Sequence, residues 1–349
     1  MRTVWIGCLA AWSLLSACRP VVREVTPRPG NAYAAGFELR DSADCCIAIV
    51  LSPWEPDKEL ARYVIREPMC RLAVSSCTHV GFLDAVGCTD RLTAVCNREL
   101  VYTPLSDGIV DLGDAMSPNY ERLLVSAPNA VLVSLYAQED PLPARLHKLG
   151  VPVVYVNEWM EHTPLARAEW VRFVGALTGH RAEADSLFAA VADRYHRLAV
   201  LAQSGRQRRS VMSGQSFRGT WYVPGGKTFM GRLFRDAGAA YRYADSDYEE
   251  SIPLTMEQAL RDFADNADVW VGVNARTMDG LRAADAKHTW FKPYRAGEVY
   301  HFMRRSTPQG ANDFWERGVV HPDEILADLI TVLYPDLLSE PLRYTGRCE

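Results

Sequence analysis

The feature that most constrains the fold is a long stretch in the middle of the chain, residues 164–202, that contains almost no helix breaker. Apolar residues recur at helical spacing before its interruption at Thr178-Gly179-His180 and again after it. The pattern predicts one long helix, or two nearly continuous helices. We therefore expect residues 161–204 to form a helical connection between two halves of the chain.

Both flanking halves alternate short apolar runs, typical of strands, with segments of helical period. The first half has predicted strands at 47–51, 71–74, 91–95, 130–135 and 151–156 and helices at 81–86, 119–126 and 141–149; the second has strands at 210–214, 269–273 and 298–302 and helices at 229–237, 255–263 and 321–333. This alternation indicates parallel or mixed sheets. The predicted fold class is α/β: two three-layer α/β lobes, residues 44–160 and 205–340, joined by a long connecting helix, with a ligand cleft between them.

The N-terminus carries an export signal. Arg2 is the only charge before an apolar stretch, residues 4–15, which ends in Leu15-Ser16-Ala17-Cys18. A basic start, a short apolar core and small residues at the cut are typical of a secretory signal. The last four residues resemble a bacterial lipobox, so residues 1–18 are predicted to be a lipoprotein signal with lipid on Cys18. Residues 19–43, rich in Pro, Arg, Gly and Ala, are predicted to be a tether.

Charge and cysteine content narrow the classes of protein. Cleavage before Cys18 leaves 332 residues (349 minus 17), enough for about two lobes at roughly 100–200 residues per domain. The loss of Arg2 moves the formal net charge from −5 to −6, and no basic face points to nucleic acid. The nine cysteines suit an oxidising compartment. Their spacing favours disulfides and buried thiols over a structural zinc site.

Several segments together resemble the periplasmic binding proteins that carry ferric siderophores, haem and cobalamin to ABC importers. Residues 74–79, 82–87 and 90–95 resemble the opening strand, pocket turn, first helix and second strand of that family, and Asp111-Leu112-Gly113 before Asn119-Tyr120-Glu121 resembles its "G…N-x-E" element. The likeness spans roughly residues 71–338. It implies a periplasmic, lipid-anchored carrier with no cofactor of its own, whose lobes grip an iron or cobalt chelate with a small closing motion.

The resemblance also implies a partner, the dimeric permease of the importer. In this family one carboxylate on each lobe docks into arginine pockets of the permease, and Glu121 and Glu257 match those positions. Carboxylate–guanidinium contacts are strong and fix register. The alternative is that each carboxylate only complements the dipole of its own helix.

Turns at the carboxyl ends of strands are expected to line the cleft. In the first lobe the candidate ligand contacts are His79, Arg98 and Tyr102, with a structural role as the alternative for His79. In the second lobe, aromatic residues beside glycines suit stacking on a flat ligand. The candidates there are Arg218, Trp221, Tyr222, Tyr248, Trp290 and Arg276, with core packing as the alternative for Trp221.

Arg98, Arg218 and Trp221 favour an anionic ferric siderophore over cobalamin, with haem third, because they offer positive charge beside one aromatic wall. Asp114, Ala115 and Met116 also stand where cobalamin-binding members place a Trp. The sequence contains no G-x-S-x-G or H-E-x-x-H motif in a suitable context, so an enzyme is not expected. Two rival functions stay open: a secreted metal-chelate enzyme using His79 with His288 or His301, and a scavenger that works without a transporter.

The lipobox yields a direct prediction. Cys18→Ala should release the protein from membranes, because the thiol that carries the lipid is lost and no other anchor is expected. Membrane fractionation and metabolic lipid labelling measure this, with Cys8→Ala as the matched control. Continued lipid labelling of the Cys18 variant would rule the anchor out.

Overall fold

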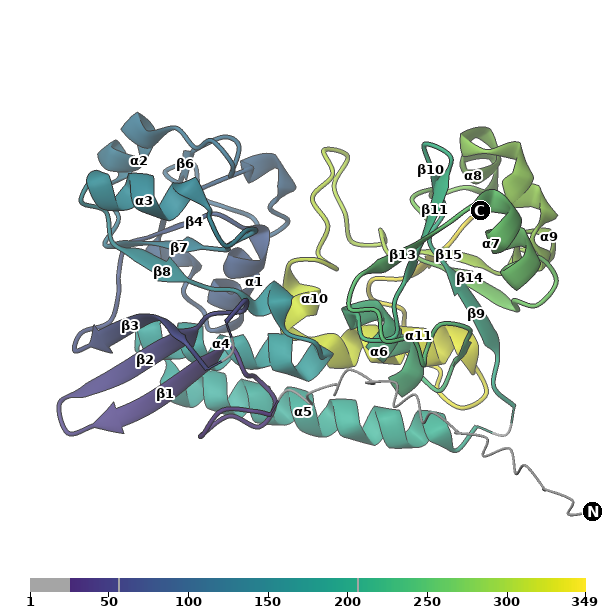
Figure 1. Ribbon diagram of the computed structural model, residues 1–349, viewed down its shortest axis with the longest axis horizontal. Coiled ribbons are helices and arrows are strands. Elements are labelled where there is room, and N and C mark those ends of the chain that lie inside the picture. The colour runs from purple at the N-terminus through teal and green to yellow at the C-terminus, as the bar shows by residue number, and fades with distance from the viewer. Residues whose placement is uncertain (1–25, 56, 206) are drawn as a thin grey trace, which may run out of the picture.

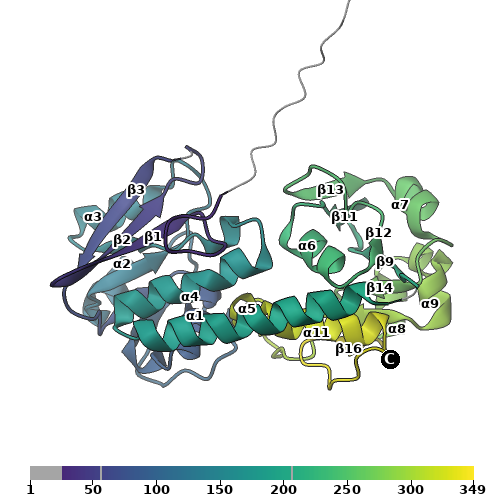
Figure 2. The ribbon, with the colours of Figure 1, turned by 90° about the horizontal axis from the view of Figure 1, so that it is seen from below.

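The computed structural model describes residues 26–55, 57–205 and 207–349. These residues form two α/β lobes that stand side by side on a layer of helices (Figures 1 and 2). The predicted signal, Cys18 and the first part of the tether lie outside the described residues. Within the described part of the chain, no helix is both long and apolar enough to cross a membrane.

The N-terminal lobe is built on a sheet of five parallel strands in the order β6-β5-β4-β7-β8. Its strands are β4 (Leu72–Val74), β5 (Leu92–Val95), β6 (Val110–Asp111), β7 (Ala130–Val133) and β8 (Val153–Tyr155). Its helices are α1 (Cys77–Ala85), η1 (Thr89–Arg91), η2 (Arg98–Leu100), α2 (Tyr120–Ser126), α3 (Pro141–Lys148) and η3 (Glu158–Met160). Every strand and helix predicted between residues 71 and 156 is present, with ends shifted by a few residues.

The C-terminal lobe has a second five-stranded sheet in the order β12-β9-β14-β15-β16, parallel except for its last pair. Its strands are β9 (Ser210–Ser213), β12 (Ala240–Tyr241), β14 (Val269–Val271), β15 (Val299–His301) and β16 (Gly346–Arg347). A small antiparallel sheet of β10 (Ser216–Phe217), β11 (Thr220–Pro224) and β13 (Ser251–Leu254) joins it. The helices are α6 (Phe229–Asp236), α7 (Met256–Phe263), α8 (Met278–Ala284), η4 (Ala286–Trp290) and α9 (Lys292–Ala296).

The connection between the lobes is a helical hairpin, so the stretch forms two helices instead of one, and the second of them is the long connecting helix that the sequence predicted. Helices α4 (Pro164–Thr178) and α5 (Arg181–Gln203) are separated at Gly179, which caps α4 in the left-handed conformation at φ +74°. They pack closely, because a Cβ on Gly175 would lie 2.4 Å from the Cβ of Ala184. Helix α5 alone, about 35 Å long at 1.5 Å per residue, runs beneath both lobes (Figure 1).

Alternate residues of each sheet face opposite cores, which makes each lobe three-layered as predicted. In the N-terminal lobe, Leu132 faces a core shared with α1 and α4, whereas Val131 faces a core shared with α2 and α3. In the C-terminal lobe, Val211 faces the first of these cores, and Met212 faces a core shared with α7. The inner faces of both sheets therefore belong to one continuous apolar core, completed by α5, α6, α10 (Arg317–Val320) and α11 (Pro322–Leu333).

An antiparallel meander of three strands precedes the N-terminal lobe. The prediction that residues 19–43 are only a tether is therefore wrong for the end of that range. Its strands are β1 (Phe37–Ser42), β2 (Cys45–Leu51) and β3 (Glu59–Ile65), so residues assigned to the tether form β1. Phe37 is fully buried and packs edge-on against Trp170 and Phe173 of α4. The strand predicted at 47–51 belongs to this meander and not to the parallel sheet of the lobe.

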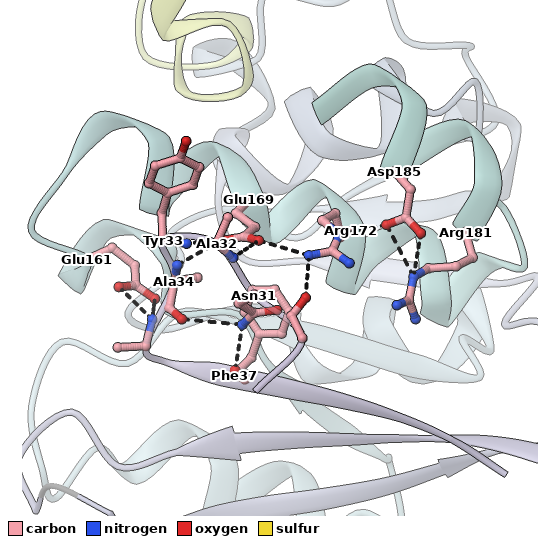
Figure 3. Close-up of polar contacts among 12 residues, drawn as sticks. Asn31, Ala32, Tyr33, Ala34, Phe37, Glu161, Glu169, Arg172, Arg181 and Asp185 are labelled. Carbon is pink, nitrogen blue, oxygen red and sulfur yellow. Dashed lines mark hydrogen bonds and ion pairs between the residues drawn. The ribbon is translucent and has the colours of Figure 1, made fainter. Parts of the chain in front are cut away.

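Two carboxylates of the helical layer hold the segment that leads into β1 (Figure 3). Glu169 is fully buried and accepts the backbone N–H groups of Ala32, Tyr33 and Ala34 at 2.7–2.8 Å. Glu161 accepts the next two N–H groups, from Ala35 and Gly36. Composition alone cannot reveal this attachment, because the acceptors lie more than 120 residues farther along the chain.

The seven cysteines within the described residues, Cys45, Cys46, Cys70, Cys77, Cys88, Cys96 and Cys348, are all free thiols. The expected disulfides are therefore not formed. Cys88, Cys96 and Cys348 are buried as small apolar side chains in three different cores.

The attachment of the N-terminal segment predicts a large stability change. Glu169→Ala should lower the free energy of unfolding by about 3–5 kcal/mol, because three N–H groups, that of Ala34 in a buried bond, lose their acceptor and Arg172 loses one of its two carboxylate partners. Urea denaturation measures it. Glu59→Ala is the matched control, since it removes only an exposed pair with Arg62, worth roughly 0–1 kcal/mol. Equal losses in the two variants would contradict the account.

Candidate functional site

Segments that follow strands β4 and β5 of the N-terminal lobe meet the segment that follows β15 of the C-terminal lobe. Helix α1, which follows β4, meets the start of α10, where a Cβ on Gly81 would lie 2.4 Å from the carbonyl oxygen of Glu316. The segment that follows β15 reaches back to the N-terminal lobe, where Glu316 accepts the N–H groups of Tyr102 and Thr103 at 2.7 and 2.8 Å. A ligand held between the lobes would therefore meet the turns at both sets of strand ends.

An aromatic pair that sequence reasoning missed lies at the strand ends of the N-terminal lobe. Tyr136, three residues beyond β7, and Trp159, in η3 beyond β8, stack with ring centroids 5.6 Å apart and planes 26° apart. Tyr136 keeps 51% of its surface exposed, and Trp159 donates a hydrogen bond to the carbonyl of Leu135. The signal in the sequence was that each residue follows a buried apolar strand at similar spacing.

The small sheet β10-β11-β13 forms the side of the C-terminal lobe that faces the N-terminal lobe (Figures 1 and 2). Strand alternation sends Tyr222 outward, 45% exposed, and Trp221 inward, fully buried. Trp221 packs on Trp270 and Phe291 and donates to the carbonyl of Ser213. Its predicted role as a ligand contact is therefore wrong, and its packing alternative is correct. Tyr248 and Phe217 are also exposed.

The three arginines predicted to contact the ligand differ in whether their guanidinium groups already donate hydrogen bonds within the protein. The guanidinium of Arg98 donates to the carbonyls of Ile109, Leu105 and Ser106, so it serves to hold the loop between β5 and β6. Arg276 donates to the hydroxyl of Ser306 at 2.5 Å. Arg218, at the tip of the β10–β11 turn with φ +52°, lies 5.1 Å from the centroid of the Phe217 ring. Of these three, Arg218 alone has no hydrogen-bond acceptor among the described residues.

The predicted histidine contact is enclosed. His79 is fully buried, and its Nε2 lies 3.1 Å from the hydroxyl of Ser134. Burial lowers the pKa of His79 to about 4, so the ring is neutral at physiological pH. The rival pairing with His288 or His301 is not formed, because His288 lies between Trp221 and Trp270 in the core of the other lobe and His301 is buried beside Gly346. His79 is therefore enclosed in the core of the N-terminal lobe and is not exposed to a ligand.

Tyr102 meets the segment between β15 and α10, residues 302–316, which rises between the two lobes in Figure 1. The guanidinium of Arg305 lies 5.0 Å from the Tyr102 ring centroid and pairs with the buried carboxylate of Asp313 at 2.5 Å. This segment therefore contacts the N-terminal lobe, and its Trp315 is exposed.

The strand ends of the N-terminal lobe also hold a buried acid and a cation that the sequence did not single out. Glu158, beside Trp159, is almost completely buried, and burial raises the pKa of its carboxyl to about 7. Arg167, on α4, attracts the ionised form of Glu158, while burial lowers the pKa of Arg167 to about 10. The Arg167 guanidinium lies 4.9 Å from the ring centroid of Phe229 in α6, at the contact between the lobes.

Two further observations bear on ligand type. A cavity of about 20 Å³, enough for one water molecule, is lined by Ser75, Met116, Ser134 and Tyr136 among others. Among residues 26–349 as far as they are described, no group of three or more His, Cys, Asp or Glu side chains is arranged to hold a metal ion.

The predicted docking residues lie on separate lobes. Glu121 is in the first turn of α2 and Glu257 in the first turn of α7, and both side chains are exposed. In Figure 1 both helices lie above the layer of helices that contains α5. Hydrogen bonds from its own backbone N–H and from Thr255 lower the pKa of Glu257.

Residues 72–302 match the profile of the family described as periplasmic binding protein. Two curated relatives, the uncharacterized lipoproteins MJ0878 and MJ0872 of Methanocaldococcus jannaschii, are 23% and 24% identical. The first alignment covers 78% of this chain and 67% of the relative, the second 68% and 61%.

Solved structures share the fold at low identity. The periplasmic haem-binding protein RhuT of Roseiflexus sp. RS-1 superposes with a TM-score of 0.60 at 18% identity, covering 76% of this chain and 98% of that one. A periplasmic haem-binding protein of Pseudomonas aeruginosa gives 0.59 at 17%, covering 80% and 98%. A periplasmic solute binding protein of Veillonella parvula gives 0.61 at 14%, covering 84% and 88%.

The buried Glu158 predicts a pH effect on stability. Its pKa is raised in the folded protein, so the folded state binds the proton more tightly and loses stability as the pH rises from about 4.5 to above 7. Glu158→Gln removes this loss and should gain about 3 kcal/mol relative to wild type over that range, at about 1.4 kcal/mol per pH unit. Urea denaturation at several pH values measures it. Parallel curves for the two proteins would contradict the assignment.

Proposed function

The chain belongs to the periplasmic binding protein family, and on that premise we propose that it is the lipid-anchored substrate-binding component of an ABC importer for a metal tetrapyrrole, haem or a corrinoid. Such a protein captures its ligand between the lobes and delivers it to the permease dimer outside the cytoplasmic membrane. The N-terminal signal and the two lipoprotein relatives support the anchor.

The stacked Tyr136–Trp159 pair carries the choice of ligand. It offers an aromatic surface at the strand ends of one lobe, while Tyr222 is exposed on the facing sheet of the other. Flat conjugated rings favour offset stacking on such side chains. The haem-binding proteins that share the fold support the same class by analogy.

A ferric siderophore is less well supported than the sequence suggested. That preference rested on Arg98, Arg218 and Trp221, and the structure engages Arg98 with three carbonyls and buries Trp221. Arg218 remains as one exposed cation at a turn. An anionic siderophore would require several free cations at the site, whereas a tetrapyrrole relies mainly on aromatic area.

The ligand test is a binding panel of haemin, cobalamin and ferric siderophores on residues 26–349. Haemin or cobalamin should stabilise the protein by about 2.7 kcal/mol at 100 times its dissociation constant, a clear shift of the melting temperature. Tyr136→Ala combined with Trp159→Ala should weaken that binding about tenfold or more, from roughly 0.5–1.5 kcal/mol of lost stacking per ring plus lost contact area. Val200→Ala is the control, because Val200 is exposed on α5, in the layer of helices beneath the lobes. Binding of siderophores alone would overturn the tetrapyrrole proposal.

The permease test separates docking from ligand capture. Glu121→Ala with Glu257→Ala should abolish stimulation of the permease ATPase and uptake, because the charge-assisted contacts to the permease are lost. The dissociation constant for the ligand should barely change, since both side chains are exposed on α2 and α7 and belong to neither of the segments that carry the Tyr136–Trp159 pair. A collapse of ligand affinity would reassign the two residues to the site or the fold.

A further inference from the structure

Arg167 is a cation whose hydrogen-bonding capacity is largely unused. Its Nε donates to the carbonyl of Glu161 at 3.1 Å, and its guanidinium lies against the Phe229 ring at the contact between the lobes. Among the residues that the structure describes, neither of its terminal nitrogens has an acceptor. An arginine presents five donors, and partial burial makes an unmade charge-assisted bond costly. Arg167 can therefore bind an anion without losing existing contacts.

Glu158 is the group most sensitive to such an anion. Its Oε2 is buried without a hydrogen-bond partner, and the positive charge of Arg167 stabilises its ionised form. The other groups that face it are Thr78 and Cys77 from α1 and Tyr136 from beyond β7. Thr78 favours the ionised form, whereas Cys77 and Tyr136 are neutral near pH 7, because burial raises the pKa of both.

The carboxylates around Arg167 already match or exceed its charge. Glu161 attracts Arg167, but its carboxylate already accepts hydrogen bonds from the N–H groups of Ala35 and Gly36 and from the indole of Trp170. A further carboxylate at Arg167 would place another negative charge beside Glu158 in a poorly solvated setting. A second negative charge close to a carboxylate favours its neutral acid form, so Glu158 would take up a proton from solvent.

We propose that Arg167 is the subsite for a carboxylate of the bound ligand, and that Glu158 takes up one proton when this carboxylate arrives. This subsite rests on the proposed function. It would orient the tetrapyrrole so that the edge that carries ionised side chains, such as the propionates of haem, points toward the helical layer. Capture is then linked to a proton, and affinity falls by up to tenfold per pH unit above the pKa of Glu158, which lies near 7.

The experiment compares haemin with iron protoporphyrin dimethyl ester, which has the same ring and no free carboxylates. Wild-type protein should bind haemin about tenfold to a hundredfold more tightly than the ester at pH 6, the range expected for a charge-assisted contact. Arg167→Gln should lose that difference and Arg167→Lys should keep part of it. Arg282→Gln, which removes only an exposed pair with Asp279, should behave as wild type.

The proton is tested separately. Haemin affinity of the wild type should fall between pH 6 and 8, whereas the Glu158→Gln variant should show little change over that range. A pH dependence that persists in this variant overturns the role of Glu158. Equal wild-type affinities for haemin and the ester overturn the Arg167 subsite while leaving the proposed function intact, and this comparison needs no variant to fold. Failure of haemin, the ester and cobalamin to bind wild type overturns the proposed function itself.

Discussion

The continuous apolar core beneath both lobes is the constraint on which the rest of the structure depends. The inner faces of the two parallel sheets, represented by Leu132 and Val211, pack on the same set of helices, α4, α5, α6 and α11. Because one core supports both sheets, the lobes cannot separate by a large angle without exposing apolar area at about 25 cal/mol per Å². Ligand capture must therefore work with small movements of the turns at the strand ends.

Buried carboxylates attach the extended segments to this helical base. Glu161 and Glu169 hold the N-terminal segment, Glu316 holds Tyr102 and Thr103 of the N-terminal lobe, and Asp328 of α11 accepts three consecutive N–H groups, from Arg343 to Thr345. In each case a side-chain acceptor replaces the neighbouring strand that these N–H groups lack. The segments near both ends of the described chain are thus fixed to the layer of helices. These attachments also limit the movement of the strand ends that lie above the helices.

Local periodicity predicted most of the fold, because the spacing of apolar residues over a few positions distinguishes helices from buried strands. The same alternation could have separated Trp221 from Tyr222, since neighbouring strand residues face opposite sides. The N-terminal attachment could not be predicted, because Glu169 and Ala32 are far apart in sequence. The environment of Glu158 was equally hidden, since its pKa depends on burial that only the folded chain creates. Arg98 and Arg167 also look alike in sequence, yet the fold gives one its acceptors and leaves the other open.

The central claim is that one shared core holds the two lobes at a nearly fixed separation while the aromatic strand ends take the ligand. Small-angle X-ray scattering of residues 26–349, with and without saturating haemin, tests it most directly. The account predicts a radius of gyration that stays the same within error, with bound haem verified by its absorption in the same sample. A clear decrease on binding would show that the lobes close about a hinge, and it would contradict the claim.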